Sequence, residues 1–284
     1  MDPAEVLADV LDVARSAVEL VEQTNTQFGN VSYVLRHGAE CFVVRFGASA
    51  ERLPGADRHA ELAVLRAVAP WSLGPEVVHC EPHRELLVTR YVAGRVWSDA
   101  ELRERAQLLR LGERFAVLHR IPPPVGVRTL ALPSYIEALE QRAAHVPDRL
   151  QDGARRLLDE LEAVSPAVCH NDVHAGNLVD DGVLRLLDWE YAAFGDPDFD
   201  LAAPISYHQL GAAEQRALLE GYEAEGRRVD RRRLSLAVWL FEYVTCLWQV
   251  AVFGHEDAGR AGLVASMKQP VVARFDELAR RLKQ

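Results

Sequence analysis

The sequence predicts an α+β protein of two lobes, a small N-terminal lobe built on an antiparallel sheet and a larger, mainly helical C-terminal lobe. Three observations support this prediction. Two hairpin patterns lie in residues 31–47 and 77–94, helical patterns dominate from Ser98 onward, and the change of character falls near Gly94. Because the sheet and the group of helices each need a hydrophobic core, we place the lobes at residues 1–93 and 94–284.

The N-terminal lobe is expected to begin with a helix. Asp2-Pro3 is typical of a helix cap followed by proline in the first turn. Apolar residues then recur at helical spacing as far as Val21, which extends the expected helix to that point. The remaining elements are a strand–turn–strand at residues 31–47 with its turn at His37-Gly38, a helix at 59–69, and a hairpin that turns near Glu81-Pro82-His83.

The C-terminal lobe is expected to contain six helices separated by breaks. Pro122-Pro123-Pro124 ends the first of them. The mainly apolar segment Val183–Leu187 predicts a short strand that ends at Asp188. The helical patterns cover residues 99–120, 134–145, 148–164, 212–225, 231–253 and 257–282.

Composition narrows the function classes. The chain has 284 residues, is 49% hydrophobic and carries a formal net charge of −10, which disfavours nucleic acid as a partner and favours cationic ligands. The four cysteines form no CxxC pair, so neither a zinc site nor a disulfide framework is indicated. The acidic N-terminus is unlike a signal peptide, and no uninterrupted apolar run approaches the ~20 residues of a membrane helix. We expect a cytoplasmic protein without membrane partners.

Residues 169–191, CHNDVHAGNLVDDGVLRLLDWEY, concentrate polar side chains around a short strand. A hairpin there would bring Asp188 beside Asn177. A carboxylate with an amide oxygen suits Mg²⁺, which completes its shell with water and substrate phosphates. Asp172 would then be free to accept a proton from a hydroxyl, as phosphoryl transfer requires. The alternative for each residue singly is a turn-capping role.

HNDVHAGN followed by LLDWEYA resembles the choline kinase and aminoglycoside phosphotransferase superfamily, with motifs most similar to bacterial choline and thiamine kinases. The resemblance implies a bilobal, protein-kinase-like fold and an enzyme that uses ATP and Mg²⁺ to phosphorylate a small molecule. It also implies that Asp172 is the catalytic base, that Asn177 and Asp188 hold magnesium, and that His170 anchors the loop.

The resemblance extends to the nucleotide site. FVVRFG matches the strand with the phosphate-binding cation, here Arg45, whose planar fork can hold phosphate oxygens. DRHAELAVL matches the helix whose carboxylate, Glu61, orients that cation. QFGNVSYVL lies where the family has its phosphate-covering turn but contains a single glycine, Gly29, so a plain hairpin turn is nearly as good an interpretation. The remaining nucleotide contacts implied are Asn30 and Ser32 in this turn, and the backbone of Arg90, Tyr91 and Val92 beside the adenine.

Several residues near the metal motif keep two interpretations. Asp196 and Asp200 in FGDPDFDLA are functional candidates, but Asp200 is placed like a helix N-cap, so we favour a structural role for it. Glu190 follows the metal motif by two residues and is expected either to attract a cationic substrate or to hold a water on the metal.

The acceptor is expected to be a small cationic alcohol, choline before thiamine and an aminoglycoside-type antibiotic third. A quaternary nitrogen is recognised by aromatic faces or carboxylates, and the helix at 231–253 offers both. Its aromatic residues could equally be core. A protein kinase is disfavoured because FGDPDFDLA follows the metal motif at once, without room for a peptide-docking segment. The substrate candidates in this helix are Glu242, Tyr243 and Trp248.

Overall fold

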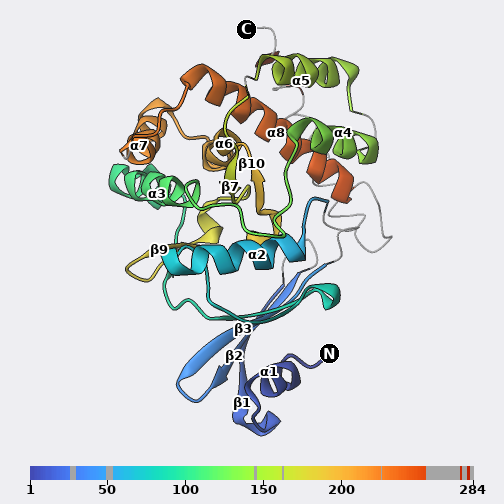
Figure 1. Ribbon diagram of the computed structural model, residues 1–284, viewed down its shortest axis with the longest axis vertical. Coiled ribbons are helices and arrows are strands. Elements are labelled where there is room, and N and C mark those ends of the chain that lie inside the picture. Colours follow the sequence, from blue (N-terminus) through green and yellow to red (C-terminus); the bar gives the residue numbers. More distant parts are fainter. Residues whose placement is uncertain are drawn as a thin grey trace.

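The structure is a computed structural model, in which the sheet with the N-terminus and the helical part with most of the later chain occupy opposite ends of the molecule (Figure 1). It describes residues 1–25, 30–48, 54–143, 146–161, 163–224, 226–253, 276, 280 and 281. The helix expected at 257–282 and the turn residue Gly29 lie outside this set, apart from three positions of the former.

The N-terminal part is built on a five-stranded antiparallel sheet. Each neighbouring pair is antiparallel, in the order β1-β2-β3-β5-β4. Gly38 takes the left-handed conformation, with φ of 59°, in the turn between β2 and β3, as glycine readily does. Both predicted hairpins are therefore present. The strands are β1 (Val18–Asn25), β2 (Val31–His37), β3 (Glu40–Phe46), β4 (Val77–Glu81) and β5 (Leu86–Arg90).

The first helix is shorter than the sequence predicts. α1 (Pro3–Leu11) is capped by Asp2, whose side chain accepts from Ala4 N at 2.9 Å. It ends where Asp12 turns left-handed, with φ of 54°. The prediction of helix as far as Val21 is wrong because Val18–Asn25 instead pairs with β2 as an edge strand. Pairing with a neighbouring strand outweighs helical periodicity here.

The helix α2 (Arg58–Val68) lies between the sheet and the helical part (Figure 1). Its N-cap Asp57 accepts from His59 N and Ala60 N, both at 3.0 Å. The backbone N–H of Asp57 donates in turn to the carbonyl of Glu190 at 3.0 Å. The start of α2 is therefore fixed directly to the segment that follows the metal motif.

The helical part matches most of the predicted helices within a few residues. α6 is the helix that the expected capping position of Asp200 indicated, but it begins earlier. It is capped by Asp196, which accepts from Asp198 N at 2.9 Å, so Asp200 lies inside the helix and its predicted capping role is wrong. The larger helices are α3 (Arg105–Leu118), α4 (Leu132–Arg142), α5 (Asp148–Glu160), α6 (Pro197–Tyr207), α7 (Ala212–Glu223) and α8 (Arg231–Phe253).

Short strands at the base of the helical part place the polar motif. β8 (Leu178–Asp180) and β9 (Leu184–Leu186) form the predicted hairpin, with β6 (Arg95–Val96) beside β8. β7 (Ala167–Cys169) pairs with β10 (Ala193–Gly195). Beyond the hairpin, Leu187 N donates to the carbonyl of Asn177 at 2.8 Å, so the residue after it, Asp188, returns beside Asn177. The predicted lobe boundary at residues 93/94 falls between β5 and β6 and stays a prediction.

α8 is long and apolar enough to cross a membrane by length and composition alone. Half of its most apolar window is buried inside the protein, and it packs against α4, α5 and α6. Its apolar character is accounted for by this packing, because a helix in the middle of a helical domain is apolar on several faces.

Candidate active site

The loop between β7 and β8 carries the side chains predicted to act on phosphate. Asn177 Nδ2 donates to the backbone carbonyl of Asp172 at 2.9 Å and lies 3.4 Å from its Oδ2. Asp188 reaches the same place from the end of the β8–β9 hairpin. All three side chains line one cavity of about 390 Å³. The structure thus brings together the three residues that the motif singled out.

His170 fastens this loop to the hairpin. Its ring is fully buried, Nδ1 accepts from Asp172 N at 3.3 Å, and Nε2 therefore carries the proton and donates to the carbonyl of Leu187 at 2.8 Å. Burial lowers the pKa of His170, which keeps the ring neutral. A neutral, internally bonded ring agrees with the expected role of loop anchor.

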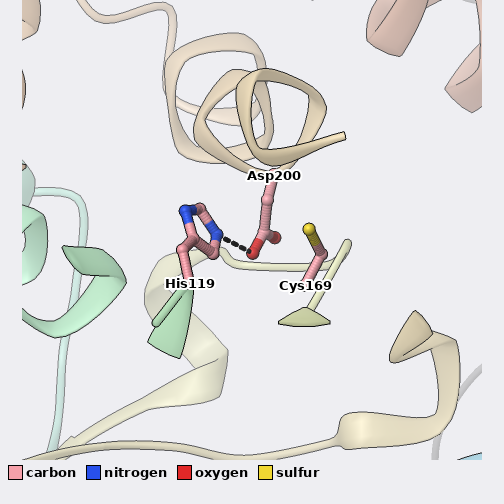
Figure 2. Close-up of side chains that lie close together, drawn as sticks. All are labelled: His119, Cys169 and Asp200. Atoms are coloured by element: carbon pink, nitrogen blue, oxygen red, sulfur yellow. Dashed lines mark hydrogen bonds and ion pairs between the residues drawn. The ribbon is translucent and has the colours of Figure 1, made fainter. Parts of the chain in front are cut away.

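Asp200 holds the backbone of the same loop from α6. Its Oδ2 accepts from His170 N at 2.9 Å and its Oδ1 from Asn171 N at 2.7 Å. Oδ2 is also 3.0 Å from His119 Nε2, as the dashed line in Figure 2 shows. His119 is held on its other nitrogen by Tyr222 Oη at 2.8 Å. The sequence indicated a structural role for Asp200 but not this one, because the contact joins residues about 30 apart.

His119, Cys169 and Asp200 converge with ligand atoms within 4.8 Å of one another, all buried (Figure 2). The donors are already committed within the protein, and Cys169 Sγ donates to the carbonyl of Ala167 at 3.4 Å. Burial, followed by the charges of Asp200 and Asp196, raises the pKa of the Cys169 thiol well above its ordinary value. A protonated thiol is a poor metal ligand, so this cluster is a hydrogen-bonded anchor for the loop that carries Asp172.

Two side chains of the site stand on left-handed backbone. Asn171 has φ of 66° and Asp188 has φ of 62°. Asn and Asp tolerate this region better than other residues that carry a Cβ, but it still costs free energy. Such conformations concentrate at functional sites. Here they aim the residue before Asp172, and Asp188 itself, into the cavity.

Arg45 on β3 is ion-paired as the family resemblance implied. Its Nη2 lies 2.5 Å from Glu61 Oε2 on α2, and its Nη1 lies 3.0 Å from Asp188 Oδ1. Burial lowers the pKa of Arg45, but Glu61, Asp188 and Glu190 together raise it above its ordinary value. The cation therefore stays charged and is held against the predicted metal ligand.

Arg58, which was not among the predicted site residues, is a second cation in the same ion network as Arg45. Its Nη1 lies 2.6 Å from Glu190 Oε2 and 3.3 Å from Glu61 Oε2, and its Nε lies 2.7 Å from Glu85 Oε2. A sequence signal did exist. Arg58 is the first residue of α2, and a cation is disfavoured at a helix N-terminus unless acidic partners hold it there.

The residues predicted to cover the phosphates are placed differently. Asn30 is buried, its Nδ2 donates to Glu190 at 2.7 Å, and its Oδ1 accepts from Ala48 N and Arg58 Nη2 at 2.8 and 3.1 Å. The Asn30 side chain therefore bridges the two parts of the protein and also lines the cavity, and its predicted contact with a phosphate stays a prediction. Ser32 lies within β2, paired with Arg45 on β3.

The predicted adenine-binding stretch is partly occupied by the protein's own hydrogen bonds. Arg90 N donates to the carbonyl of Glu76 and Tyr91 N to that of Cys41, both at 2.9 Å. The Arg90 side chain pairs with Glu40 and Glu76 on the surface, outside the cavity. Within the described residues, the N–H of Val92 has no such bond, so a nucleotide contact here would be made by Val92.

Two of the predicted substrate residues do not reach the cavity. Tyr243 is fully buried, stacks on Trp239 and donates to Glu140 Oε1 at 2.6 Å, so it belongs to the core. Glu242 is not among the residues that line the cavity and pairs with Arg281 at 2.6 Å. Both predictions are corrected. Trp248 does line the cavity, and so does Glu190, whose carboxylate is already bonded to Arg58 and Asn30.

The cavity is more aromatic than α8 alone suggested. Tyr207 donates its hydroxyl to Asp172 Oδ1 at 2.8 Å, while Asp172 Oδ2 accepts from Asn177 Nδ2 at 3.4 Å. The aromatic residues come from α4, η6 (Trp189–Tyr191), α6 and α8, so no single stretch of sequence reveals them. They are Tyr135, Tyr191, Phe199, Tyr207, Phe241 and Trp248.

Negative charge exceeds positive charge around the cavity. Burial, then the charge of Asp188, raises the pKa of Asp172 well above its ordinary value, although the bond from Tyr207 opposes this. Burial and the neighbouring Glu190 raise the pKa of Asp188 to about 7, against the opposing effect of Arg45. A cation placed between Asp172 and Asp188 would favour the charged form of both carboxylates and lower both pKa values.

The donor set fits a hard divalent cation. Asn177 uses its amide nitrogen on the carbonyl of Asp172, which leaves Oδ1 for a ligand. Asp188 uses Oδ1 for Arg45, which leaves Oδ2. Two oxygens from the protein, with water and phosphate oxygens supplying the rest, is the coordination that Mg²⁺ accepts.

Comparison with known proteins identifies the family. The model of the phosphotransferase enzyme family matches residues 21–236. The thiamine kinase of Escherichia coli O1:K1 / APEC is 33% identical over 238 residues, covering 77% of this chain and 81% of that enzyme. The chain belongs to the phosphotransferase enzyme family. The resemblance seen in the sequence is confirmed, and this phosphotransferase acts on a small molecule.

Solved structures share the fold of this phosphotransferase. Choline kinase LicA from Streptococcus pneumoniae is 20% identical with a TM-score of 0.75, over 96% of this chain and 97% of that one, and LicA has also been solved with AMP. A choline/ethanolamine kinase family protein from Mesorhizobium loti is 22% identical with a TM-score of 0.72, over 100% and 94%. The predicted α+β, kinase-like fold is confirmed, and nucleotide binding follows from the family.

The anchor at Asp200 generates a prediction for this phosphotransferase. Both carboxylate oxygens accept from backbone N–H groups, so in Asp200→Asn the new amide nitrogen must face a donor whichever way it turns. We expect the free energy of unfolding to fall by about 1–3 kcal/mol, the cost of an unsatisfied buried group, and kcat to fall with it. Urea unfolding and steady-state kinetics measure the two.

Asp99→Asn is the matched control, because Asp99 also pairs with a histidine, His208 at 2.7 Å, but its side chain is 81% exposed. Its unfolding free energy should change by no more than about 0.5 kcal/mol. Equal effects in the two variants would contradict the anchoring role of Asp200.

Proposed function

We propose that this phosphotransferase transfers the γ-phosphate of ATP to the hydroxyl of a small cationic alcohol, with thiamine as the first candidate and choline as the second. The observation that carries the proposal is Asp172, whose carboxylate lines a cavity walled by aromatic rings. Aromatic faces favour a cation that cannot donate hydrogen bonds. Carboxylates at the other end favour the same charge.

The order of the two alcohols is the reverse of the one that the sequence alone suggested. Two observations support the reversal. The curated relative that covers most of this chain at 33% identity is a thiamine kinase, whereas the choline kinases are similar at 20–22% and support the fold only. A cavity of about 390 Å³ with six aromatic side chains is also suited to an acceptor with rings of its own.

The proposed reaction needs one proton transfer within the protein. The acceptor hydroxyl lies against Asp172 Oδ2, which takes its proton as the oxygen forms a bond to the γ-phosphorus. The bond between that phosphorus and the bridging oxygen breaks, and ADP leaves. Tyr207 and Asn177 hold the carboxylate in place through bonds to its Oδ1 and to its backbone. Such positioning supplies most of the catalysis in phosphoryl transfer.

Magnesium would be held by Asn177 and Asp188 and would neutralise charge on the phosphates. Arg45, held by Glu61, is positioned to bind phosphate oxygens on the other side. Glu190 is bonded to Arg58 and Asn30, so we assign it to fixing the two parts of the protein around the nucleotide. A cytoplasmic location, where ATP is available, fits this proposal.

An antibiotic acceptor of the aminoglycoside type remains the third candidate. It would require several carboxylates free to meet its ammonium groups. Of the carboxylates that line the described cavity, Glu190 and Asp188 are each already bonded to an arginine. A protein substrate is disfavoured because α6 begins directly after β10, as the sequence indicated.

The assignment of Asp172 as base predicts the behaviour of Asp172→Asn. The amide cannot accept the hydroxyl proton, so kcat should fall ~10²- to 10⁴-fold, while the affinity for ADP, which does not involve this proton, stays within a factor of about two. Phosphate transfer and ADP binding by calorimetry measure the two quantities. Asp181→Asn, on the surface turn of the β8–β9 hairpin, is the control. Turnover of Asp172→Asn near the wild-type rate would remove Asp172 from the role.

The aromatic wall predicts a difference between two tryptophans of α8. Trp248 lines the cavity, whereas Trp239 stacks on Tyr243 in the core. Trp248→Leu should raise KM for the cationic alcohol by about 5- to 30-fold, the range of a desolvated cation–π contact. Trp239→Leu should leave KM unchanged in whatever fraction remains folded. Initial rates normalised to active enzyme test this, and equal KM values for all three proteins would place the cation elsewhere.

A further inference from the structure

Arg128 is a cation on the wall of the acceptor cavity without an acidic partner. It lies between α3 and α4, and its Nη2 makes one long bond, 3.5 Å, to the carbonyl of Tyr191. Its Nε is buried without a hydrogen-bond partner, and among the described residues it takes part in no ion pair. Burial lowers the pKa of Arg128 from its ordinary value, which is the direction expected for an uncompensated cation.

The backbone around Arg128 is held by hydrogen bonds, so the residue has a defined position beside the cavity. Phe194 N donates to the carbonyl of Arg128 at 2.8 Å, and Leu130 N donates to the carbonyl of Phe194 at 2.9 Å. These bonds join the segment to β10. The other arginines at the site differ from Arg128, because Arg45 and Arg58 each meet at least two carboxylates. A half-buried arginine whose Nε is buried without a partner, beside a cavity, indicates a ligand that accepts hydrogen bonds.

Arg128 also lies close to the catalytic loop. The carbonyl of Tyr191 that accepts from Arg128 accepts from Asn171 Nδ2 as well, at 3.1 Å, and Asn171 immediately precedes Asp172. One carbonyl thus links the guanidinium to the segment that carries the base. An acceptor molecule placed with its hydroxyl at Asp172 has Arg128 within the same cavity.

We propose that Arg128 is a specificity residue that donates hydrogen bonds to a ring nitrogen or oxygen of the acceptor, so the preferred acceptor carries a heteroaromatic ring in addition to its hydroxyl and its cation. A guanidinium both donates to such atoms and stacks on aromatic rings. Choline offers Arg128 only a positive charge, which repels it. The aminopyrimidine of thiamine offers ring nitrogens. The inference rests on the proposed function and narrows its acceptor.

The test compares two alcohols that differ only in this group. One is thiamine, and the other is the corresponding N-methylthiazolium alcohol, which keeps the hydroxyl and the cation but lacks the aminopyrimidine. In Arg128→Leu, KM for thiamine should rise about 10- to 100-fold, the range for losing a hydrogen bond to a charged group, with kcat nearly unchanged. KM for the truncated alcohol should change far less. Arg128→Lys, which keeps a donor, should restore part of the preference.

The outcomes separate the inference from the function on which it rests. Suppose that wild-type enzyme phosphorylates both alcohols. If Arg128→Leu then raises both KM values by the same factor, or leaves both KM values unchanged, Arg128 does not recognise the aminopyrimidine ring and the inference is wrong. If wild-type enzyme phosphorylates choline but neither of these two alcohols, the inference is wrong and the proposed function stands. If it phosphorylates none of the three, the proposed function fails and the inference fails with it. Circular dichroism of each variant shows whether a loss reflects unfolding, and the ratio of the two KM values is independent of the folded fraction.

Discussion

The buried ion network around Arg45 and Arg58 is the constraint on which the site depends. Arg45 comes from the sheet, Arg58 and Glu61 from α2, and Asp188 and Glu190 from the segment after β9. Taking these charges out of water costs several kcal/mol per ion, so the network adds little to net stability. Loss of one partner, in contrast, strands another and costs about 3–5 kcal/mol. The network therefore specifies one arrangement of sheet, helix and loop.

That arrangement gives the cavity two chemically different kinds of lining. Asp172, Asn177 and Asp188 supply polar groups on backbone held by His170 and Asp200, while aromatic rings and Arg128 line the same cavity. Glu61 and Glu190 are each paired with an arginine, and Asp188 shares Arg45 with Glu61. Burial is the main cause of the raised pKa values of Asp172 and Asp188, and the charges of Asp188 on the first and of Glu190 on the second add to it. A nucleotide with its metal would bring the missing positive charge to the place where phosphate is transferred.

Local pattern was sufficient for much of the fold and for the core of the site. The motif around Asp172 predicted the hairpin that returns Asp188 to Asn177. This was possible because the strand residues and the turn of a hairpin lie within one short stretch of sequence. The strand β1 was missed because its pairing partner, and not its own periodicity, decides its conformation. The sequence pattern placed the start of α6 at Asp200, although Asp196-Pro197 is also a good cap for the same helix.

Long-range contacts account for the other errors. The anchoring of His170 by Asp200, the link from Arg58 to Glu190 over 132 positions, and the bond from Tyr207 to Asp172 join segments that no window of sequence contains together. Tyr243 and Trp248 are five positions apart on one helix, yet one is core and one lines the cavity, because neighbouring helices decide which face is covered. Arg128 has no sequence motif. Its meaning comes from its place beside the cavity with a buried Nε that has no hydrogen-bond partner and with no ion pair among the described residues.

We expect a metal ion bound with the nucleotide to neutralise surplus negative charge of the site at Asp188. The most direct measurement is the affinity for ADP by calorimetry, with and without Mg²⁺, in the wild-type protein and in Asp188→Asn. Mg²⁺ should strongly increase the affinity of the wild-type protein for ADP. Most of this increase in affinity should disappear in Asp188→Asn. An equal gain in both proteins, or none in the wild-type protein, would contradict this expectation.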